Sequence, residues 1–141
     1  MELSSIYTEL IMEHSRSSRN RRLLEEKDRE ERGHNPNCGD DITLQIKFAG
    51  GKIDDLAFTG SGCAISQAST SIMIDLIKGK GKEEALELID IFLRLIKGDG
   101  LTEEEEEKLG EAVVLKNISY MPARVKCAVL AWHTLKELIK S

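Results

Sequence analysis

Asn35-Pro36-Asn37-Cys38-Gly39-Asp40-Asp41 is the stretch around which the rest of the chain is arranged. It sets a thiol and a carboxylate two residues apart in a segment that cannot be helical. Asn37 and Gly39 tolerate positive φ, and Pro36 fixes its own φ, so the segment predicts a turn with Cys38 at its apex. We therefore expect this loop to present the Cys38 side chain.

Two further thiols lie at expected turns or helix starts. Cys63 ends the glycine-rich turn at residues 59–62, and Cys127 follows residues 122–126, where a helix is expected to begin. A lone cysteine is often a small apolar residue of the core, and this alternative stays open for each thiol. As a set the cysteines favour a shared site, because each lies beside Gly, Asp or Lys and outside the apolar stripes.

Length and composition set limits on the kind of protein. The 141 residues are enough for one core, so we expect a single domain over residues 1–141. Hydrophobic residues at 40% and charged residues at 32% are typical of a soluble protein, and no apolar run approaches the roughly 18 residues of a membrane span. The net charge of -5 argues against sequence-independent nucleic-acid binding and favours protein partners.

The cysteines and the first residues predict a compartment. Three cysteines cannot all pair with one another, and residues 1–6 lack the basic start and apolar block of a signal peptide. We therefore expect reduced thiols and a cytoplasmic location.

Hydrophobic and polar residues alternate on both sides of Gly50-Gly51, which predicts a β-hairpin. The apolar positions are Ile42, Leu44, Ile46 and Phe48 before the turn and Ile53, Leu56 and Phe58 after it. The first strand begins just after Cys38 and Asp40, and the second runs into Cys63. Antiparallel pairing is therefore expected to bring two thiols and a carboxylate together.

Helical spacing of apolar residues predicts helices at about residues 2–14, 64–77, 82–97 and from 122 nearly to the end of the chain. Thr102 and Glu105 form a capping-box pattern for a short acidic helix. Its five consecutive glutamates are interpreted as an exposed face and not as a metal site. Cys63 would precede the helix at 64–77, where unpaired backbone N–H groups stabilise a thiolate.

Residues 14–32 carry dense mixed charge, with Leu23 and Leu24 as the only apolar pair, and predict a solvated loop. The arginines of this loop could contact an acidic partner, but charge runs are most often solvated surface. His14 is a conceivable ligand, yet a histidine at a helix end is more often a cap or a surface residue.

Cys38, Asp40, Cys63 and Cys127 together offer three thiolates and one carboxylate, a set suited to tetrahedral zinc or to iron in a cluster. Structural zinc sites favour Cys or Cys plus His with one closely spaced pair, and this sequence has neither a CxxC pair nor an HExxH motif. A carboxylate among three remote cysteines therefore indicates a site that exchanges its contents. The sequence has no Walker loop, dinucleotide fingerprint, nucleophile elbow or kinase signature that would suggest a common small-molecule enzyme.

At these residues the sequence resembles the iron-sulfur cluster assembly scaffold family, the IscU-like proteins, and most closely its SufU branch. The resemblance covers nearly the whole chain and is carried by Glu13-His14, Arg19-Asn20, residues 35–40, residues 60–66 and residues 122–127. It implies an α+β fold of the SufE/IscU-like type, a small antiparallel sheet with helices on one face and a metal site at one end. The family's ligand positions match Cys38, Asp40, Cys63 and Cys127.

Two departures from IscU proper point to the SufU branch. Lys126 stands where IscU has a histidine before its last cysteine, and the segment between Cys63 and Cys127 is longer here. The resemblance to SufU implies a zinc-bound form that receives sulfur from a cysteine desulfurase. Residues 121–126 replace the chaperone-recognition motif Leu-Pro-Pro-Val-Lys, which argues against a dedicated Hsp70-type chaperone.

Two functions therefore stand, neither of them that of a conventional enzyme. The first is a scaffold that accepts sulfur from a cysteine desulfurase, binds a metal or a 2Fe-2S cluster at the Cys3Asp site and passes the cluster to carrier or acceptor proteins. The alternative is a zinc-dependent sulfurtransferase that relays persulfide sulfur without building the cluster. A purely structural zinc site is the third, simplest interpretation. Ligand identity alone does not separate zinc from iron.

Cys38 is expected to receive the sulfur, because it lies in a loop without periodic structure. Cys127, beside the ammonium group of Lys126, is the second candidate.

Overall fold

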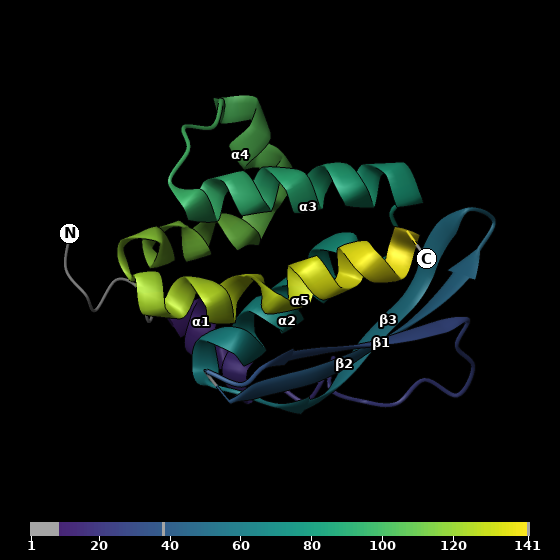
Figure 1. The fold of residues 1–141 in the computed structure, drawn as a ribbon. Coiled ribbons are helices and arrows are strands. Elements are labelled where there is room, and N and C mark those ends of the chain that lie inside the picture. The colour runs from purple at the N-terminus through teal and green to yellow at the C-terminus, as the bar shows by residue number, and fades with distance from the viewer. Residues whose placement is uncertain (1–8, 38, 141) are drawn as a thin grey trace.

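The computed structural model describes residues 9–37 and 39–140. Along the chain the elements are α1 (Glu9–Arg16), β1 (Arg29–Asn35), β2 (Asp40–Ala49), β3 (Lys52–Ser61), α2 (Ala64–Ile77), α3 (Lys82–Lys97), α4 (Glu103–Leu109), the 3-10 helix η2 (Gly110–Tyr120) and α5 (Pro122–Lys140). The strands form one antiparallel sheet with the helices gathered on one side, and α3 and α4 lie farthest from it (Figure 1). This arrangement confirms the predicted α+β class.

The sheet is an antiparallel meander in the order β1-β2-β3. Gly50 and Gly51 have φ of 60° and 79°, which is the positive-φ pair that a tight two-residue hairpin requires. In the β2–β3 register Asp41 lies opposite Ser61, so the end of β3 returns to the start of β2. The predicted hairpin and its turn are confirmed.

The prediction of a solvated loop over residues 14–32 is wrong at its end. β1 begins at Arg29 and pairs with β2 over its whole length, from Arg29 opposite Ile46 to Asn35 opposite Asp40. No apolar alternation marks this strand, because its one fully buried residue is Gly33. A Cβ at Gly33 would lie 2.1 Å from Thr134 Oγ1, so the backbone of β1 packs closely against side chains of α5 there.

The remainder of that stretch, residues 17–28, follows the edge of β3 and then crosses the sheet face opposite the helices (Figure 1). The Phe58 N–H donates to the Asn20 carbonyl and the Arg22 N–H donates to the Phe58 carbonyl, both at 3.0 Å. Further on, the Leu24 N–H donates to Oε1 of Gln45 at 2.8 Å. The segment therefore covers buried polar groups of β2 and β3 rather than lying free in solvent.

His14 is buried, so its interpretation as a surface residue is wrong. Its Nδ1 lies 2.9 Å from Ser71 Oγ on α2, and Asn20 Nδ2 donates to the same hydroxyl at 3.0 Å. Arg19 and Asn20 both hydrogen-bond Asp75, which also lies on α2. These contacts hold α1 and the following loop against α2. The predicted helix over residues 2–14 is described only from Glu9, and residues 2–8 lie outside the described residues.

The central helix α2 has small, hydroxyl-bearing residues in its first half, and α5 packs closely against them. Ser69 Oγ donates to the Ala128 carbonyl at 2.6 Å and accepts from Trp132 Nε1 at 2.9 Å. The Trp132 ring stacks on Phe92 of α3 with centroids 3.8 Å apart. One continuous core therefore joins α2, α3 and α5, and it brings the first turns of α5 close to the start of α2.

The other helices follow the predicted bounds closely. α2 and α3 cover residues 64–77 and 82–97 as predicted, and the capping box of Thr102 and Glu105 is formed. The stretch after Leu109, which lacks α-helical spacing, is a 3-10 helix. Its buried apolar residues recur every third position, at Ala112, Leu115 and Ile118, which is the period of a 3-10 helix. Among the described residues, no helix has the length and apolar character needed to cross a membrane.

Candidate metal site

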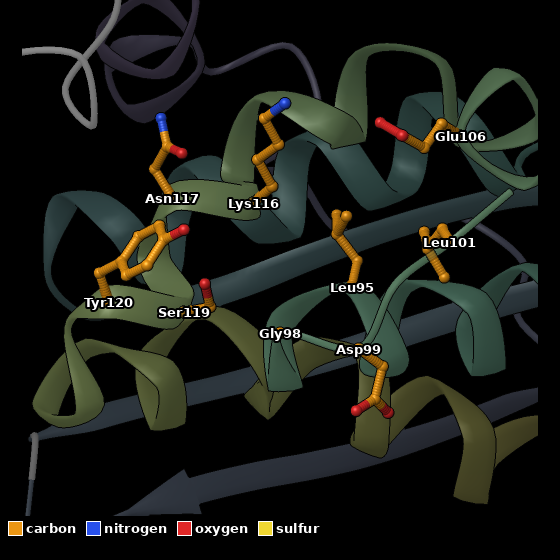
Figure 2. A pocket seen from close by; sticks show the side chains of 9 residues that line it. All are labelled: Leu95, Gly98, Asp99, Leu101, Glu106, Lys116, Asn117, Ser119 and Tyr120. Carbon is orange, nitrogen blue, oxygen red and sulfur yellow. The ribbon is translucent and has the colours of Figure 1, made fainter. Parts of the chain in front are cut away.

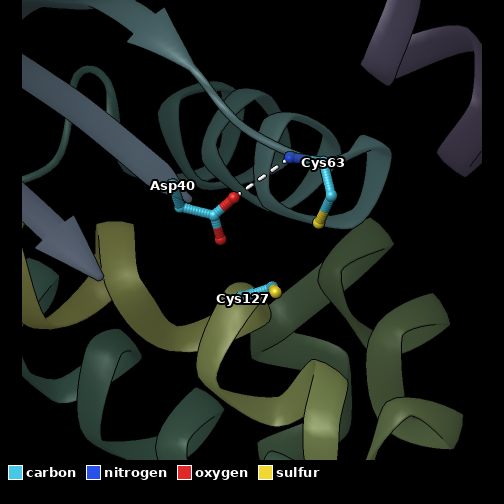
Figure 3. Close-up of side chains that lie close together, drawn as sticks. All are labelled: Asp40, Cys63 and Cys127. Atoms are coloured by element: carbon cyan, nitrogen blue, oxygen red, sulfur yellow. Dashed lines mark hydrogen bonds between the residues drawn. The ribbon is translucent and has the colours of Figure 1, made fainter. Parts of the chain in front are cut away.

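Three of the four predicted site residues meet at one end of the sheet (Figure 3). Asp40 begins β2, Cys63 directly precedes α2, and Cys127 lies in the second turn of α5. The two Sγ atoms and one carboxylate oxygen all lie within 4.8 Å of one another. The fourth predicted residue, Cys38, lies outside the described residues.

The Asp40 carboxylate is fully buried, and its two oxygens have different surroundings. Oδ1 accepts a hydrogen bond from the Cys63 backbone N–H at 3.0 Å. Oδ2 has no hydrogen-bond partner among the described residues and points toward Cys127 (Figure 3). A buried carboxylate oxygen without a donor is unfavourable, and a cation at this point would compensate it. Burial of Oδ2 without a donor is therefore the arrangement expected of a metal ligand in a structure that contains no metal.

The neighbouring Asp41 points to the other face of β2 and has a different role. Arg32 donates to both of its carboxylate oxygens, at 2.8 and 2.6 Å. These hydrogen bonds lower the pKa of Asp41, and the pair lies at the protein surface. Strand alternation thus sends one of two adjacent carboxylates into the site and the other into an exposed ion pair.

Cys63 is the N-cap of α2, as predicted. Its φ of -70° and ψ of 169° are extended, and its Sγ accepts from the Ser66 backbone N–H at 3.4 Å. The unpaired amides and the positive end of the helix dipole favour a negative charge at this position. The half-buried Cys63 sulfur therefore lies at the N-terminus of α2, with a backbone N–H directed at it.

The glycines before Cys63 allow two strand ends to approach closely. Gly60 has φ of 120°, and a Cβ there would lie 2.1 Å from the Asp41 carbonyl. A Cβ on Gly62 would lie 2.7 Å from Asp40 Oδ1. Any larger residue at these positions would push the end of β3 away from the start of β2.

Cys127 differs from what the sequence indicates. The prediction that all three cysteines lie outside apolar stripes is wrong for Cys127, which is 1% exposed and belongs to the hydrophobic core together with Ala128 and Ala131. Its sequence neighbour Lys126 is exposed. A thiol can be both a core residue and a candidate ligand when, as here, the helix that buries it also brings it beside a second thiol and a carboxylate.

One polar atom beside these residues was missed by the sequence analysis. The Ser66 hydroxyl lies one helical turn after Cys63, is buried, and has no hydrogen-bond partner among the described residues. The spacing of three residues from Cys63 on a helix was the available signal, because it places both side chains on one face.

The donor set suits zinc or iron. Two soft thiolates and one hard carboxylate, from three separate elements, are a mixture that zinc and iron accept, whereas magnesium and calcium prefer oxygen donors alone. These three residues do not complete a tetrahedral coordination by themselves. The residues present therefore fit the predicted kind of metal centre.

A separate hollow of about 250 Å³ lies between the end of α3 and η2 (Figure 2). It is lined by Leu95, Gly98, Asp99, Leu101, Glu106, Lys116, Asn117, Ser119 and Tyr120. None of these lining residues is a cysteine or a predicted site residue. The hollow contributes nothing to the candidate metal site.

Comparison with known proteins shows independently which family the chain resembles. A family model described as the NifU-like N terminal domain matches residues 6–140. The iron-sulfur cluster assembly scaffold protein IscU of Streptococcus pyogenes serotype M1 is 42% identical over 99% of this chain and 86% of its own length. The zinc-dependent sulfurtransferase SufU of Bacillus subtilis (strain 168) is 38% identical over 96% of this chain and 90% of its own.

A solved structure gives the same result for the fold. The putative iron-sulfur cluster assembly scaffold protein for the SUF system from Fervidobacterium islandicum AW-1 superposes with a TM-score of 0.90 at 39% identity, over 98% of this chain and 99% of that one. The fold, the family match and the relatives agree with the resemblance that the cysteine motifs carry. The chain therefore belongs to the NifU-like N-terminal domain family, with the IscU and SufU scaffold proteins among its relatives.

Proposed function

We propose that this chain is a scaffold for iron-sulfur cluster assembly that binds a metal ion or a 2Fe-2S cluster through Cys38, Asp40, Cys63 and Cys127. One observation carries the proposal above all others: the buried Oδ2 of Asp40 has no hydrogen-bond donor among the described residues and lies in a group with two thiols. The scaffold names of the relatives support the same assignment.

In this proposal each ligand has a distinct part. Cys63 and Cys127 supply thiolates from two helices, and Asp40 supplies Oδ2 while the Cys63 amide holds Oδ1. Cys38 lies two residues before Asp40 in the sequence and supplies the fourth ligand. A bound zinc ion would keep the thiols deprotonated, whereas a cluster is cargo that the site assembles and releases.

We also propose that Cys38 accepts sulfur from a cysteine desulfurase. The Cys38 thiolate would attack the outer sulfur of the desulfurase persulfide. A new S–S bond forms on Cys38, the old one breaks, and the desulfurase cysteine leaves as a thiolate with the electron pair. The surroundings of the other thiols support this choice, because Cys63 is fixed as a helix cap and Cys127 is 1% exposed.

The test is mass spectrometry after incubation with a cysteine desulfurase and cysteine. Loss of the added sulfur atom is expected in Cys38→Ser, with the adduct retained in Cys127→Ser. A full adduct in Cys38→Ser together with its loss in Cys127→Ser would instead assign the acceptor role to Cys127.

The second candidate function is a zinc-dependent sulfurtransferase that relays sulfur without building a cluster. The relative from Bacillus subtilis that bears this name, and Lys126 in place of a histidine, favour it. Anaerobic incubation with ferrous iron, desulfurase and cysteine separates the two functions. A scaffold gains the visible absorption of a cluster and passes it to an apo acceptor protein, whereas a sulfurtransferase keeps its zinc and passes on only sulfur.

The partners and location follow from this chemistry. We propose a cysteine desulfurase and downstream cluster carriers or acceptors as partners, in a reducing cytoplasm where free thiols persist. We propose neither a nucleic-acid partner nor a dedicated Hsp70-type chaperone. Co-purification with a desulfurase, compared between the unaltered chain and Cys38→Ser, measures the first of these contacts.

A further inference from the structure

We infer that Ser66 is a positioning residue of the metal site. In the metal-bound state its hydroxyl would turn to donate a hydrogen bond to Oδ1 of Asp40, beside the hydrogen bond from the Cys63 N–H, and so keep Oδ2 directed at the metal. This inference rests on the proposed function, because it assigns a role around the same site. Ser66 is not one of the four proposed ligands and binds no metal itself.

The position of Ser66 on α2 brings its hydroxyl to the carboxylate. It is the third residue of the helix, and helical side chains lean toward the N-terminus, which here is the site. The point where a Cβ of Gly62 would lie is 3.1 Å from Ser66 Oγ and 2.7 Å from Asp40 Oδ1. Because residue 62 is a glycine, it places no side chain between the hydroxyl and the carboxylate.

The backbone N–H and carbonyl of Ser66 are both hydrogen-bonded, whereas its hydroxyl is not hydrogen-bonded to any described residue. Its backbone N–H donates to Cys63 Sγ at 3.4 Å, and its carbonyl accepts from Thr70 Oγ1 at 2.7 Å. Its Oγ is buried and has no partner among the described residues. Buried hydroxyls are nearly always hydrogen-bonded, so this one calls for an acceptor close by.

Asp40 Oδ1 has room for that donor. An ionised carboxylate oxygen accepts two hydrogen bonds, and the Cys63 N–H supplies one. With both donors on Oδ1, rotation of the carboxylate would break two hydrogen bonds, which would keep Oδ2 toward the thiols. Partners of this kind, which hydrogen-bond a ligating group, typically change metal affinity by about 10- to 100-fold when removed.

The experiment uses the full chain loaded with Co²⁺, whose thiolate charge-transfer absorption reports the bound metal. Release to an excess of chelator is timed for the unaltered chain, Ser66→Ala, Asp40→Ala and the double variant. Ser66→Ala is expected to release Co²⁺ about 10-fold faster. In the Asp40→Ala background the same change should have no further effect, because the hydroxyl acts through Asp40.

Ser69→Ala is the matched control. Ser69 is also a buried serine of α2, but its hydroxyl is fully engaged by Ala128 and Trp132. Its loss should lower the melting temperature of the metal-free chain and leave the Co²⁺ release rate unchanged. Ser66→Ala should do the reverse, since removing a hydroxyl without a partner does not weaken the metal-free fold.

Two results would overturn the role of Ser66. One is an unchanged release rate in Ser66→Ala, and the other is an equal acceleration with and without Asp40, which would place the effect in the fold. If the unaltered chain binds no Co²⁺ at all, the proposed metal site is wrong and the role of Ser66 falls with it. Binding by the unaltered chain with no effect of Ser66→Ala rejects this inference alone.

Discussion

The backbone N–H of Cys63 donates a hydrogen bond to Oδ1 of Asp40 at 3.0 Å, so the residue that caps α2 also orients the carboxylate at the start of β2. The β2–β3 hairpin makes this contact possible, because its register returns Ser61 to a position opposite Asp41. One hydrogen bond therefore couples two candidate ligands that are distant in sequence. Displacing either residue is expected to disturb both.

Gly62→Ala tests that coupling directly. The added Cβ would lie 2.7 Å from Asp40 Oδ1, closer than atoms tolerate, so the carboxylate must shift. We expect metal affinity to fall by about 10-fold or more, the scale typical of a disturbed ligand orientation. Gly100→Ala is the control, because a Cβ there meets nothing within 4 Å. Equal affinities of the two variants, measured by chelator competition, would contradict the crowding argument.

Removal of the metal is expected to lower the melting temperature. A ligand that binds only the folded chain stabilises it by about 2.7 kcal/mol at one hundred times its Kd. For a chain of this size such a loss corresponds to a fall of roughly 10 °C, measured by calorimetry with and without chelator. Cys63→Ser should melt at nearly the same temperature in both conditions. If the chelator leaves the melting temperature of the unaltered chain unchanged, the site is empty or wrongly assigned.

Gly33→Ala is expected to loosen α5 from β1. The new Cβ would lie 2.1 Å from Thr134 Oγ1, and overpacking of this kind typically costs about 1–3 kcal/mol. Thr134→Ala in the same chain removes the colliding atom and should restore much of the free energy of unfolding. Urea unfolding of the two single variants and the double variant measures the rescue, and additive losses would show that the close approach is not the cause.

Asp55 is expected to make the fold sensitive to acid. Burial by itself raises the pKa of Asp55, but hydrogen bonds from Arg22 and Lys78 outweigh it and hold the pKa at about 2, below its ordinary 3.8. The folded pKa is the lower one, so this stabilisation is complete above the unfolded pKa and is lost as the pH falls from 3.8 toward 2.

Asp55→Asn should therefore lower the free energy of unfolding by about 2 kcal/mol or less at neutral pH, because each unit of pKa shift corresponds to about 1.36 kcal/mol. Near pH 2 the same substitution should lower it very little. The exposed neighbour Asp54 supplies the control variant Asp54→Asn. Urea unfolding at several pH values measures both. A loss for Asp55→Asn that stays the same at every pH would exclude the carboxylate charge as its origin.

Local patterns determined a large part of this protein. The Gly50-Gly51 hairpin, the bounds of α2 and α3 and the capping box at Thr102 are all predictable, because turn chemistry, capping and apolar spacing act over a few residues. The hairpin and the helix that follows it also predict that Asp40 and Cys63 come together. Motif residues around the cysteines were enough to identify the family.

Only the tertiary structure decided the features that depend on partners far along the chain. β1 is a strand because Gly33 fits against α5, and a glycine leaves no hydrophobic signal in the sequence. His14 and Cys127 are buried because α1 and α5 pack on the small residues of α2, which spacing alone does not show. The Asp40 and Ser66 oxygens that lack a partner among the described residues lie where β2 and α2 meet. A buried polar atom is a property of the three-dimensional surroundings, and no local pattern encodes it.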